Sequence, residues 1–226
     1  MPKIYIVHFE EDPEAIVRFR MRSRYLWESH VDYAGRAIAS IIDDVPALPA
    51  IIDCMNANAD DIGNVLTTYY GSVYGTTFTD LFKEHIKIAL ATVRAIKDKT
   101  SIETLTAEDR ANAEAIADCL ASLDPVNWDK ETVLSHLENH IAGTTAQATA
   151  RMTKEWATEL SAYDEGRACM AQIADIIANG IVAVFPEKFV RFEEWMSPGM
   201  TAGAVVYANP NADPNKNKNI TPTPKK

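Results

Sequence analysis

The feature that most constrains this chain is a helix-period pattern over residues 14–44 that includes a histidine. Apolar and small side chains recur there at spacings of three and four, which is typical of a helix face buried against a core. The positions that share this face are Ile16, Phe19, Ser23, Leu26, His30, Tyr33, Ala37 and Ile41. The pattern predicts a helix about 45 Å long, at ~1.5 Å per residue, with His30 pointing inward.

The rest of the chain has the same helical periodicity, interrupted by residues that end helices. Asp12-Pro13-Glu14 provides a capping acid and a proline at the first helical position of the first helix. The helices that we expect cover residues 14–44, 50–70 with a break near 56–58, 74–99, 106–123, 129–142 and 145–184. The fold prediction is therefore all-α, an up-and-down bundle of about six helices.

The two ends of the chain lack this periodicity. Residues 1–12 mix apolar and polar side chains in a way that favours a short extended arm. Residues 190–226 are irregular, and their last part, 208–226, is a polar tail rich in Pro, Asn and Lys. The expected organisation is an arm at 1–12, a bundle at 13–189 and a tail at 190–226. The arm and residues 208–226 are candidates for contact with a second copy of the chain or an assembly partner.

Charge and cysteine content limit the classes of partner and compartment. The formal net charge is −10, which argues against a nucleic-acid-binding surface, because phosphate binding needs clustered Lys and Arg. Three dispersed cysteines, without a CxxC pair or a secretory leader, indicate free thiols and a cytoplasmic location. No apolar run reaches the roughly 20 residues that cross a bilayer, so a soluble protein without membrane contact is expected.

Three histidines lie in the apolar stripes of three different expected helices. His30 and His85 lie near the middle of the first and third helices, and His140 lies near the end of the fifth. Each one taken alone is best interpreted as a neutral core histidine that a carbonyl or a carboxylate satisfies. Together they favour a metal centre, because facing helices build metal sites in the interior of bundles. His136, four residues before His140, could chelate a metal with it, but a solvated His136 is the favoured interpretation.

The last expected helix adds an acid to this group. Asp164 lies near the middle of residues 145–184, at the level of His30 and His85 in an up-and-down bundle. Asp175 lies three turns further along, about 16 Å along the axis, too far to share a mononuclear site with Asp164. The predicted ligands are therefore His30, His85 and Asp164, with His140 as a fourth.

Four other residues are candidates for supporting or alternative ligands. These are Glu28, Glu84, Asp175 and Tyr163. Both glutamates point away from the histidine face of their own helix, so each is either a surface charge or a partner that orients a histidine on a neighbouring helix. Imidazole and carboxylate donors suit zinc, iron, manganese or nickel without choosing among them. The chain has no GxGxxG, GxxxxGK[ST], HExxH or GxSxG motif, so we expect no nucleotide cofactor and can name no reaction.

The residues around the histidines resemble a group of bacterial proteins. The matching segments are Leu26-Trp27-Glu28 with His30-Val31, Leu81 with Glu84-His85, His140 with Thr144, Tyr163-Asp164, and Ala174-Asp175. Over residues 20–186 this pattern is similar to an uncharacterised all-helical family that is common in spore-forming bacilli. The resemblance implies that His30, His85, His140, Asp164 and Asp175 are family positions of a shared buried polar site. Gln147 and Arg167 replace glutamates of the relatives, which argues against an acid-rich or dinuclear site. Glycosyltransferase and kinase labels on that group find no supporting motif here.

Two functional hypotheses follow from the sequence. In the first, the bundle binds a metal ion or a small ligand at a buried His/Asp centre. In the second, the chain is a structural or assembly protein, its histidines are satisfied core groups, and its termini engage neighbouring subunits. The first is favoured, because three histidines in three helical stripes exceed what packing alone requires.

Overall fold

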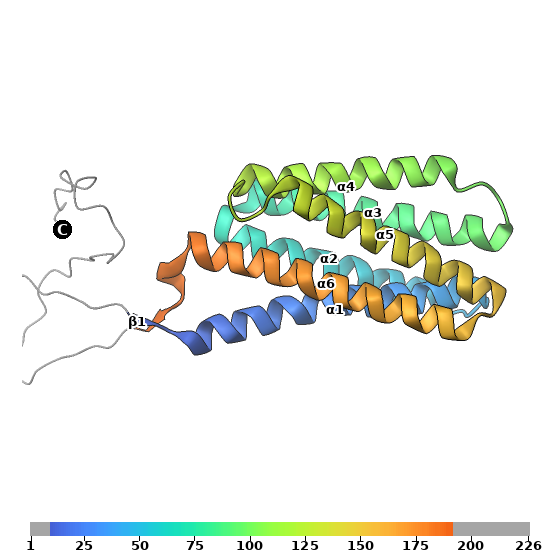
Figure 1. The fold of residues 1–226 in the computed structure, drawn as a ribbon, viewed down its shortest axis with the longest axis horizontal. Coiled ribbons are helices and arrows are strands. Elements are labelled where there is room, and N and C mark those ends of the chain that lie inside the picture. Colours follow the sequence, from blue (N-terminus) through green and yellow to red (C-terminus); the bar gives the residue numbers. More distant parts are fainter. Residues whose placement is uncertain (1–9, 192–226) are drawn as a thin grey trace, which may run out of the picture.

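A computed structural model describes residues 10–191 of the chain and shows six long helices in one bundle (Figure 1). The helices are α1 (Pro13–Ile42), α2 (Leu48–Tyr70), α3 (Ser72–Asp98), α4 (Glu103–Leu123), α5 (Lys130–Thr153) and α6 (Trp156–Val184). They run alternately in opposite directions, so the predicted all-α, up-and-down bundle is confirmed. Residues 1–9 and 192–226, which include most of the predicted arm and tail, lie outside the described residues.

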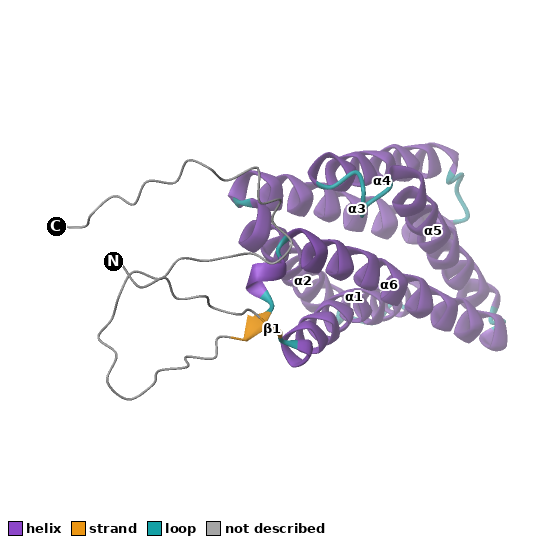
Figure 2. Ribbon diagram, turned by 60° about the vertical axis from the view of Figure 1, so that its left-hand side comes forward, coloured by secondary structure: helices purple, strands orange, loops and turns teal. Residues whose placement is uncertain are grey.

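The packing order places three of the helices at the centre. Each helix packs against the next one along the chain, and α6 returns to pack against α1. In addition, α1, α3 and α5 contact one another pairwise. Figure 2 shows the helices side by side, with short loops at the two ends of the bundle. Side chains that point inward from α1, α3 and α5 therefore meet in one region.

Local sequence signals explain where α1 begins and where α2 gives way to α3. The Asp12 carboxylate accepts hydrogen bonds from the backbone N–H groups of Glu14 and Ala15, at 3.1 and 3.2 Å, and caps α1 as expected. Gly71, with φ +96°, lies between α2 and α3 in a conformation that side chains disfavour.

The expected break in the second helix does not occur. Helix α2 is continuous through residues 56–58. Asn58 is buried, and its side-chain Nδ2 donates a hydrogen bond to the Leu26 carbonyl of α1 at 3.0 Å. The asparagine therefore satisfies its amide across the helix interface instead of capping a new helix.

The boundary between the last two helices differs most from the prediction. The expected break at Gly143 and Thr144 is wrong, because the Thr144 hydroxyl donates to the His140 carbonyl at 3.0 Å and α5 continues to Thr153. The chain turns at Lys154, where φ is +63°. His140 therefore lies near the middle of α5, not at its end.

An ion-pair network holds this turn in place. Arg151, near the end of α5, donates from Nη1 to Glu159 of α6 at 2.7 Å and from Nε to Asp43, which follows α1, at 3.1 Å. Glu159 is almost completely buried. One guanidinium group thus joins the C-terminal ends of α1 and α5 to the first turn of α6.

The described ends of the arm and tail pair with each other. Strands β1 (Glu10–Glu11) and β2 (Val190–Arg191) form a short antiparallel ladder, after the 3-10 turn η1 (Pro186–Lys188). The Asp12 N–H also donates to the Phe189 carbonyl at 2.8 Å. The extended segment expected before the first helix thus has an intramolecular partner over its last residues.

Helix α6 is long and apolar enough to cross a membrane by length and composition alone. A core helix of a soluble bundle passes the same test, so the signal is weak evidence for a membrane span. The apolar stripe of α6 includes Met170, Ile173, Ile177 and Ile181, all buried in the bundle. Of the apolar window of α6 that passes this test, 39% is buried inside the bundle.

Candidate metal centre

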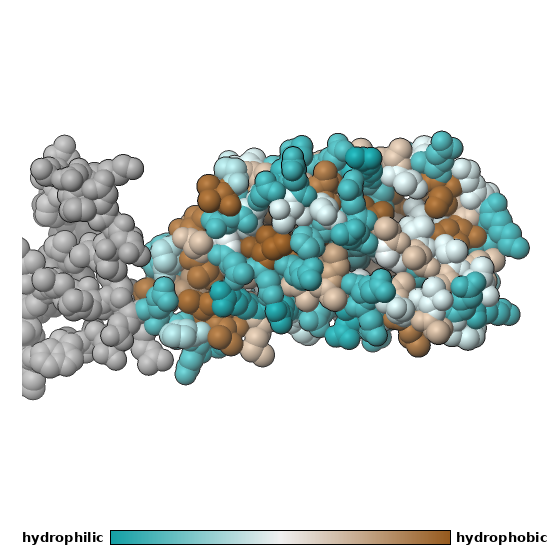
Figure 3. All heavy atoms as spheres, viewed as in Figure 1, coloured by the Kyte–Doolittle hydropathy of each residue, from teal (hydrophilic) through white to brown (hydrophobic). Residues whose placement is uncertain are grey.

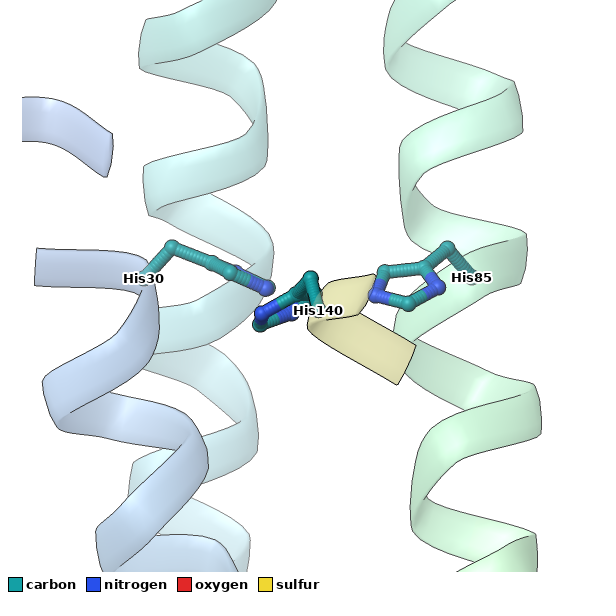
Figure 4. A group of neighbouring side chains, drawn as sticks. All are labelled: His30, His85 and His140. Atoms are coloured by element: carbon teal, nitrogen blue, oxygen red, sulfur yellow. The ribbon is translucent and has the colours of Figure 1, made fainter. Parts of the chain in front are cut away.

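Three histidine side chains converge at the centre of the bundle. His30 comes from α1, His85 from α3 and His140 from α5 (Figure 4). Their ring centroids lie 5.9 Å apart for His30 and His85, 5.6 Å for His30 and His140, and 5.7 Å for His85 and His140. One ring nitrogen from each residue lies within 4.8 Å of the other two. The three helices that pack pairwise thus each contribute one imidazole to a nearly equilateral cluster.

The cluster is shielded from solvent. Relative exposure is 1% for His30, 6% for His85 and 4% for His140. The fully buried Phe82 ring packs against the group, with its centroid 4.8 Å from that of His30 and 5.9 Å from that of His85. The imidazoles therefore face one another in an environment of low polarity, where an unpaired polar atom is costly.

A carboxylate on the neighbouring helix orients one of the three rings. Asp109 of α4 is buried, and its Oδ1 lies 3.0 Å from Nδ1 of His85. Because a carboxylate only accepts hydrogen bonds, this contact places a hydrogen on Nδ1, so that Nε2 is the nitrogen of His85 that can bind a metal. Figure 4 shows one nitrogen of His85 directed at the other rings and one directed away. A carboxylate behind a histidine in this manner is the usual second partner of a metal-bound imidazole.

The other two rings have unsatisfied nitrogens. Nδ1 of His30 and Nδ1 of His140 are buried and have no hydrogen-bond partner among the described residues. Most buried polar side-chain atoms in proteins do have a partner. Both residues thus depart from the usual arrangement for a core histidine, in which a carbonyl or a carboxylate satisfies the ring.

Burial and mutual repulsion keep these rings neutral. Desolvation, followed by the proximity of His140 and His85, holds the pKa of His30 well below its ordinary value. Desolvation and the neighbouring His85 lower the pKa of His140 to about 3. At neutral pH both imidazoles are therefore deprotonated, the form that binds a metal, and no proton has to be displaced.

The spacing of the nitrogens is close to that of a coordinated cluster. Three atoms no more than 4.8 Å apart share a point that lies about 2.8 Å or less from each of them, whereas zinc–imidazole bonds are ~2.0–2.1 Å long. An inward shift of each ring by less than about 1 Å closes this difference, a movement within the range of side-chain adjustment on binding. The described residues can thus hold one metal ion through three imidazoles.

Asp164, one of the three principal ligands expected from sequence, does not join the cluster. Its side chain is exposed on α6, and the described metal-binding group consists only of His30, His85 and His140. The expected level of Asp164 depended on a helix starting at residue 145, but α6 starts at Trp156. With the observed boundaries, His140 and not Asp164 lies at the level of the other two histidines.

The four residues expected to support the site have other partners. Arg24 donates from Nε to Asp175 at 2.8 Å, and this guanidinium lowers the pKa of the carboxyl. The Tyr163 hydroxyl donates to Asp32 at 3.2 Å. Asp175 and Tyr163 thus contribute to contacts between α1 and α6 outside the centre.

The two glutamates pair with cations on the surface. Glu28 accepts from Arg167 at 3.2 Å, and Glu84 accepts from Lys87 at 3.0 Å.

His136 is only partly buried and lies beside Cys169, whose thiol donates to the His136 carbonyl at 3.2 Å. His136 therefore does not chelate with His140.

Asp109 is the functional residue that the sequence analysis missed. It was assigned to the start of the fourth helix, which in fact begins earlier, at Glu103. A signal was present, because Asp109 is in phase with the buried stripe Ala113, Ile116 and Leu120. An acid at an inward position of one helix, beside a helix with an inward histidine, would have indicated the pair.

Comparison of the chain with models of known protein families, with curated proteins and with solved structures gives no match. The class that the fold and the site define is an all-α bundle with a buried triple-histidine cluster.

Proposed function

We propose that this protein is a metal-binding helical bundle in which His30, His85 and His140 hold one divalent transition metal ion. The observation that carries the proposal is the convergence of three buried imidazoles, two of which, His30 and His140, have a buried Nδ1 without a hydrogen-bond partner among the described residues. The Asp109 carboxylate supports it further, because it orients His85 and offsets part of the charge of a buried cation.

The donor set narrows the choice of metal. With Asp164 outside the cluster, the site offers only imidazole nitrogens, which suit zinc, iron or nickel better than manganese. Three protein ligands leave at least one coordination position open, as in zinc sites that bind a water molecule or a substrate. A metal ion in such a site supplies Lewis acidity and lowers the pKa of bound water. The chain's own contribution is to exclude bulk solvent and to fix the three rings.

Metal analysis of purified protein tests the proposal. Wild-type protein from cultures supplemented with zinc, iron and nickel should contain close to one equivalent of a single metal by mass spectrometry. The variant H85Q should lose most of it, whereas H136Q, which alters a histidine outside the cluster, should retain it. Wild-type protein without stoichiometric metal, or equal loss from both variants, would exclude the proposed centre.

A second candidate function is assembly with a further copy of the chain. One face of α1 exposes large apolar side chains at a spacing of four, namely Val17 (50%), Met21 (65%) and Tyr25 (71%). An exposed apolar stripe of this kind is typical of a protein contact. The double variant M21E/Y25E should reduce a dimer to a monomer in light scattering. A wild-type protein that is already monomeric at high concentration would contradict the assembly hypothesis.

Location and family also remain proposals. A cytoplasmic location is supported by Cys54, Cys119 and Cys169, which are free thiols among the described residues. Membership of the bacilli-type helical family rests on the residues around the histidines. Three of the five positions that the resemblance marks as a shared site, His30, His85 and His140, do lie together.

A further inference from the structure

A large cleft lies between α4 and α5. Its volume is about 740 Å³, within the range of small-molecule sites. On α5 its lining extends from Glu138 to Thr153, about 22 Å of helix at ~1.5 Å per residue. Figure 3 has the same view as Figure 1, and in the region of α4 and α5 it shows tan and near-white residues between the teal hydrophilic ones. The cleft is therefore long and mainly apolar.

The inner end of the cleft reaches the histidine cluster. Asp109 and Thr92 line the cleft, and both also line a cavity of about 10 Å³ beside His85. Asp109 is 5% exposed; its Oδ1 accepts a hydrogen bond from Nδ1 of His85, while its Oδ2 accepts no hydrogen bond from a described residue. One buried carboxylate thus faces the imidazole with one oxygen and leaves the other available at the floor of the cleft.

The lining accepts hydrogen bonds but donates few. Four of its threonine hydroxyls donate to the backbone of their own helix and so present only methyl groups and lone pairs; these are Thr92, Thr106, Thr149 and Thr153. A ligand that fits this lining is apolar along its length and carries its own hydrogen-bond donors.

The charges of the lining favour a cation. Asp109, Glu138 and Glu155 contribute three carboxylates, against the single guanidinium of Arg110. That guanidinium already pairs with Glu138 at 3.3 Å, and also with Glu114 at 3.5 Å. An anionic amphiphile would therefore meet unneutralised carboxylates, whereas an ammonium group would gain from them.

We infer that the cleft between α4 and α5 binds a long aliphatic amine, with its ammonium group at Asp109 and its chain along the alanines and threonines of α5. Such a ligand combines apolar length with hydrogen-bond donors and positive charge at one end. Binding in the cleft does not require a metal ion. In the bound state Asp109 would lie between the ammonium group and His85. The cleft could therefore serve as the substrate site of the metal centre, and that role rests on the proposed function.

Calorimetric titration of the full-length protein with n-octylamine, 1-octanol and octanoate tests this inference. The amine should bind at least about tenfold more tightly than octanoate, a difference of ~1.4 kcal/mol. The variant D109N should bring amine binding down to the level of the alcohol. Octanoate binding as tight as the amine, or no binding of the amine, would overturn the inference.

Two variants locate the binding in the cleft. Ala146 and Thr149 are exposed and line it, so A146W and T149W should each abolish amine binding without disturbing the core. Ala168 is an exposed helical alanine on α6 outside the lining, so A168W is the matched control and should bind like the wild type. Amine binding that survives both cleft variants would contradict the assignment.

Metal content measured on the same samples separates the two proposals. A146W should keep the metal content of the wild type, because Ala146 is not in the histidine cluster. Amine binding by wild-type protein that contains no metal after expression in metal-supplemented cultures would support the cleft, and the absence of metal would exclude the metal centre. A metal-loaded wild type that does not bind the amine would support the metal centre and exclude the amine-binding cleft.

Discussion

At the level of single residues, the centre depends on the contrast between His85 and the other two histidines. His85 has a carboxylate partner, whereas the Nδ1 atoms of His30 and His140 have none among the described residues. Helical periodicity was sufficient to predict that all three rings point inward. It could not identify Asp109, because a short polar side chain near a helix start is equally typical of a cap.

The Asp109–His85 pair leads to a prediction for metal affinity. Replacing Asp109 with asparagine removes the charge that fixes the His85 tautomer, so affinity should fall by ~10- to 100-fold. Asp118 lies on the same helix and pairs with Lys130 on the surface, so D118N is the control and should leave affinity unchanged. Competition with a chromophoric chelator measures both variants. Equal affinities would show that Asp109 has no part in the centre.

The neutral rings also predict acid sensitivity of the metal-free protein. Because the pKa of His140 is about 3 in the folded state and ~6.5 in the unfolded chain, the unfolded state binds the extra proton between these values. Stability therefore falls as the pH drops below ~6.5, by about 1 kcal/mol for this residue between pH 6 and pH 5. The lowered pKa of His30 acts in the same direction.

Urea unfolding at pH 6 and pH 5 in the presence of a chelator measures this loss. The double variant H30L/H140L lacks both titrating groups and should lose less stability over the same interval. An equal loss in wild type and variant would mean that the histidines are not buried in neutral form.

At the level of elements, helix boundaries marked by capping residues could be predicted from the sequence. Boundaries without such local signals could not. The start of α1 follows from Asp12 and Pro13. By contrast, Gly143 and Thr144 resemble a helix end, although the helix continues because Thr144 bonds within it. The real turn uses Lys154 in a left-handed conformation, which its residue type does not indicate. This single boundary explains why Asp164 was predicted as a ligand and why His140 was expected near the end of its helix instead of near the middle.

Two glycine substitutions test these element assignments. A Cβ on Gly75 would lie 2.8 Å from the Gly63 carbonyl oxygen, where α2 and α3 approach closely, so G75A should destabilise the fold by about 1–3 kcal/mol. A Cβ on Gly143 would meet nothing within 4 Å, so G143A inside a continuous α5 should stabilise it by about 0.5–1 kcal/mol. Chemical denaturation compares the two. Destabilisation by G143A would contradict the continuity of α5.

At the level of the whole molecule, the histidines link three helices that are far apart in sequence. His30, His85 and His140 lie on α1, α3 and α5, the helices that contact one another pairwise at the centre. A metal ion bound there would connect most of the chain through one point. Metal binding should therefore stabilise the fold as a unit and not one local segment.

This linkage gives a prediction for thermal unfolding. A ligand that binds only the folded state stabilises it by about 4 kcal/mol at a free concentration of ~1,000 times its dissociation constant. Adding the preferred metal to chelator-treated wild type should raise the melting temperature in a single transition. The variant H85Q should show little change under the same conditions. A shift of equal size in both proteins would indicate metal binding elsewhere.

The most direct test of the centre is anomalous diffraction from crystals of the metal-loaded protein, recorded at the absorption edge of the bound metal. We expect one strong peak at about 2.0–2.2 Å from a ring nitrogen of each of His30, His85 and His140. Asp109 should remain hydrogen-bonded to His85 in these crystals. A peak at other residues, or three histidines around no metal in protein crystallised with saturating metal, would contradict the proposed centre.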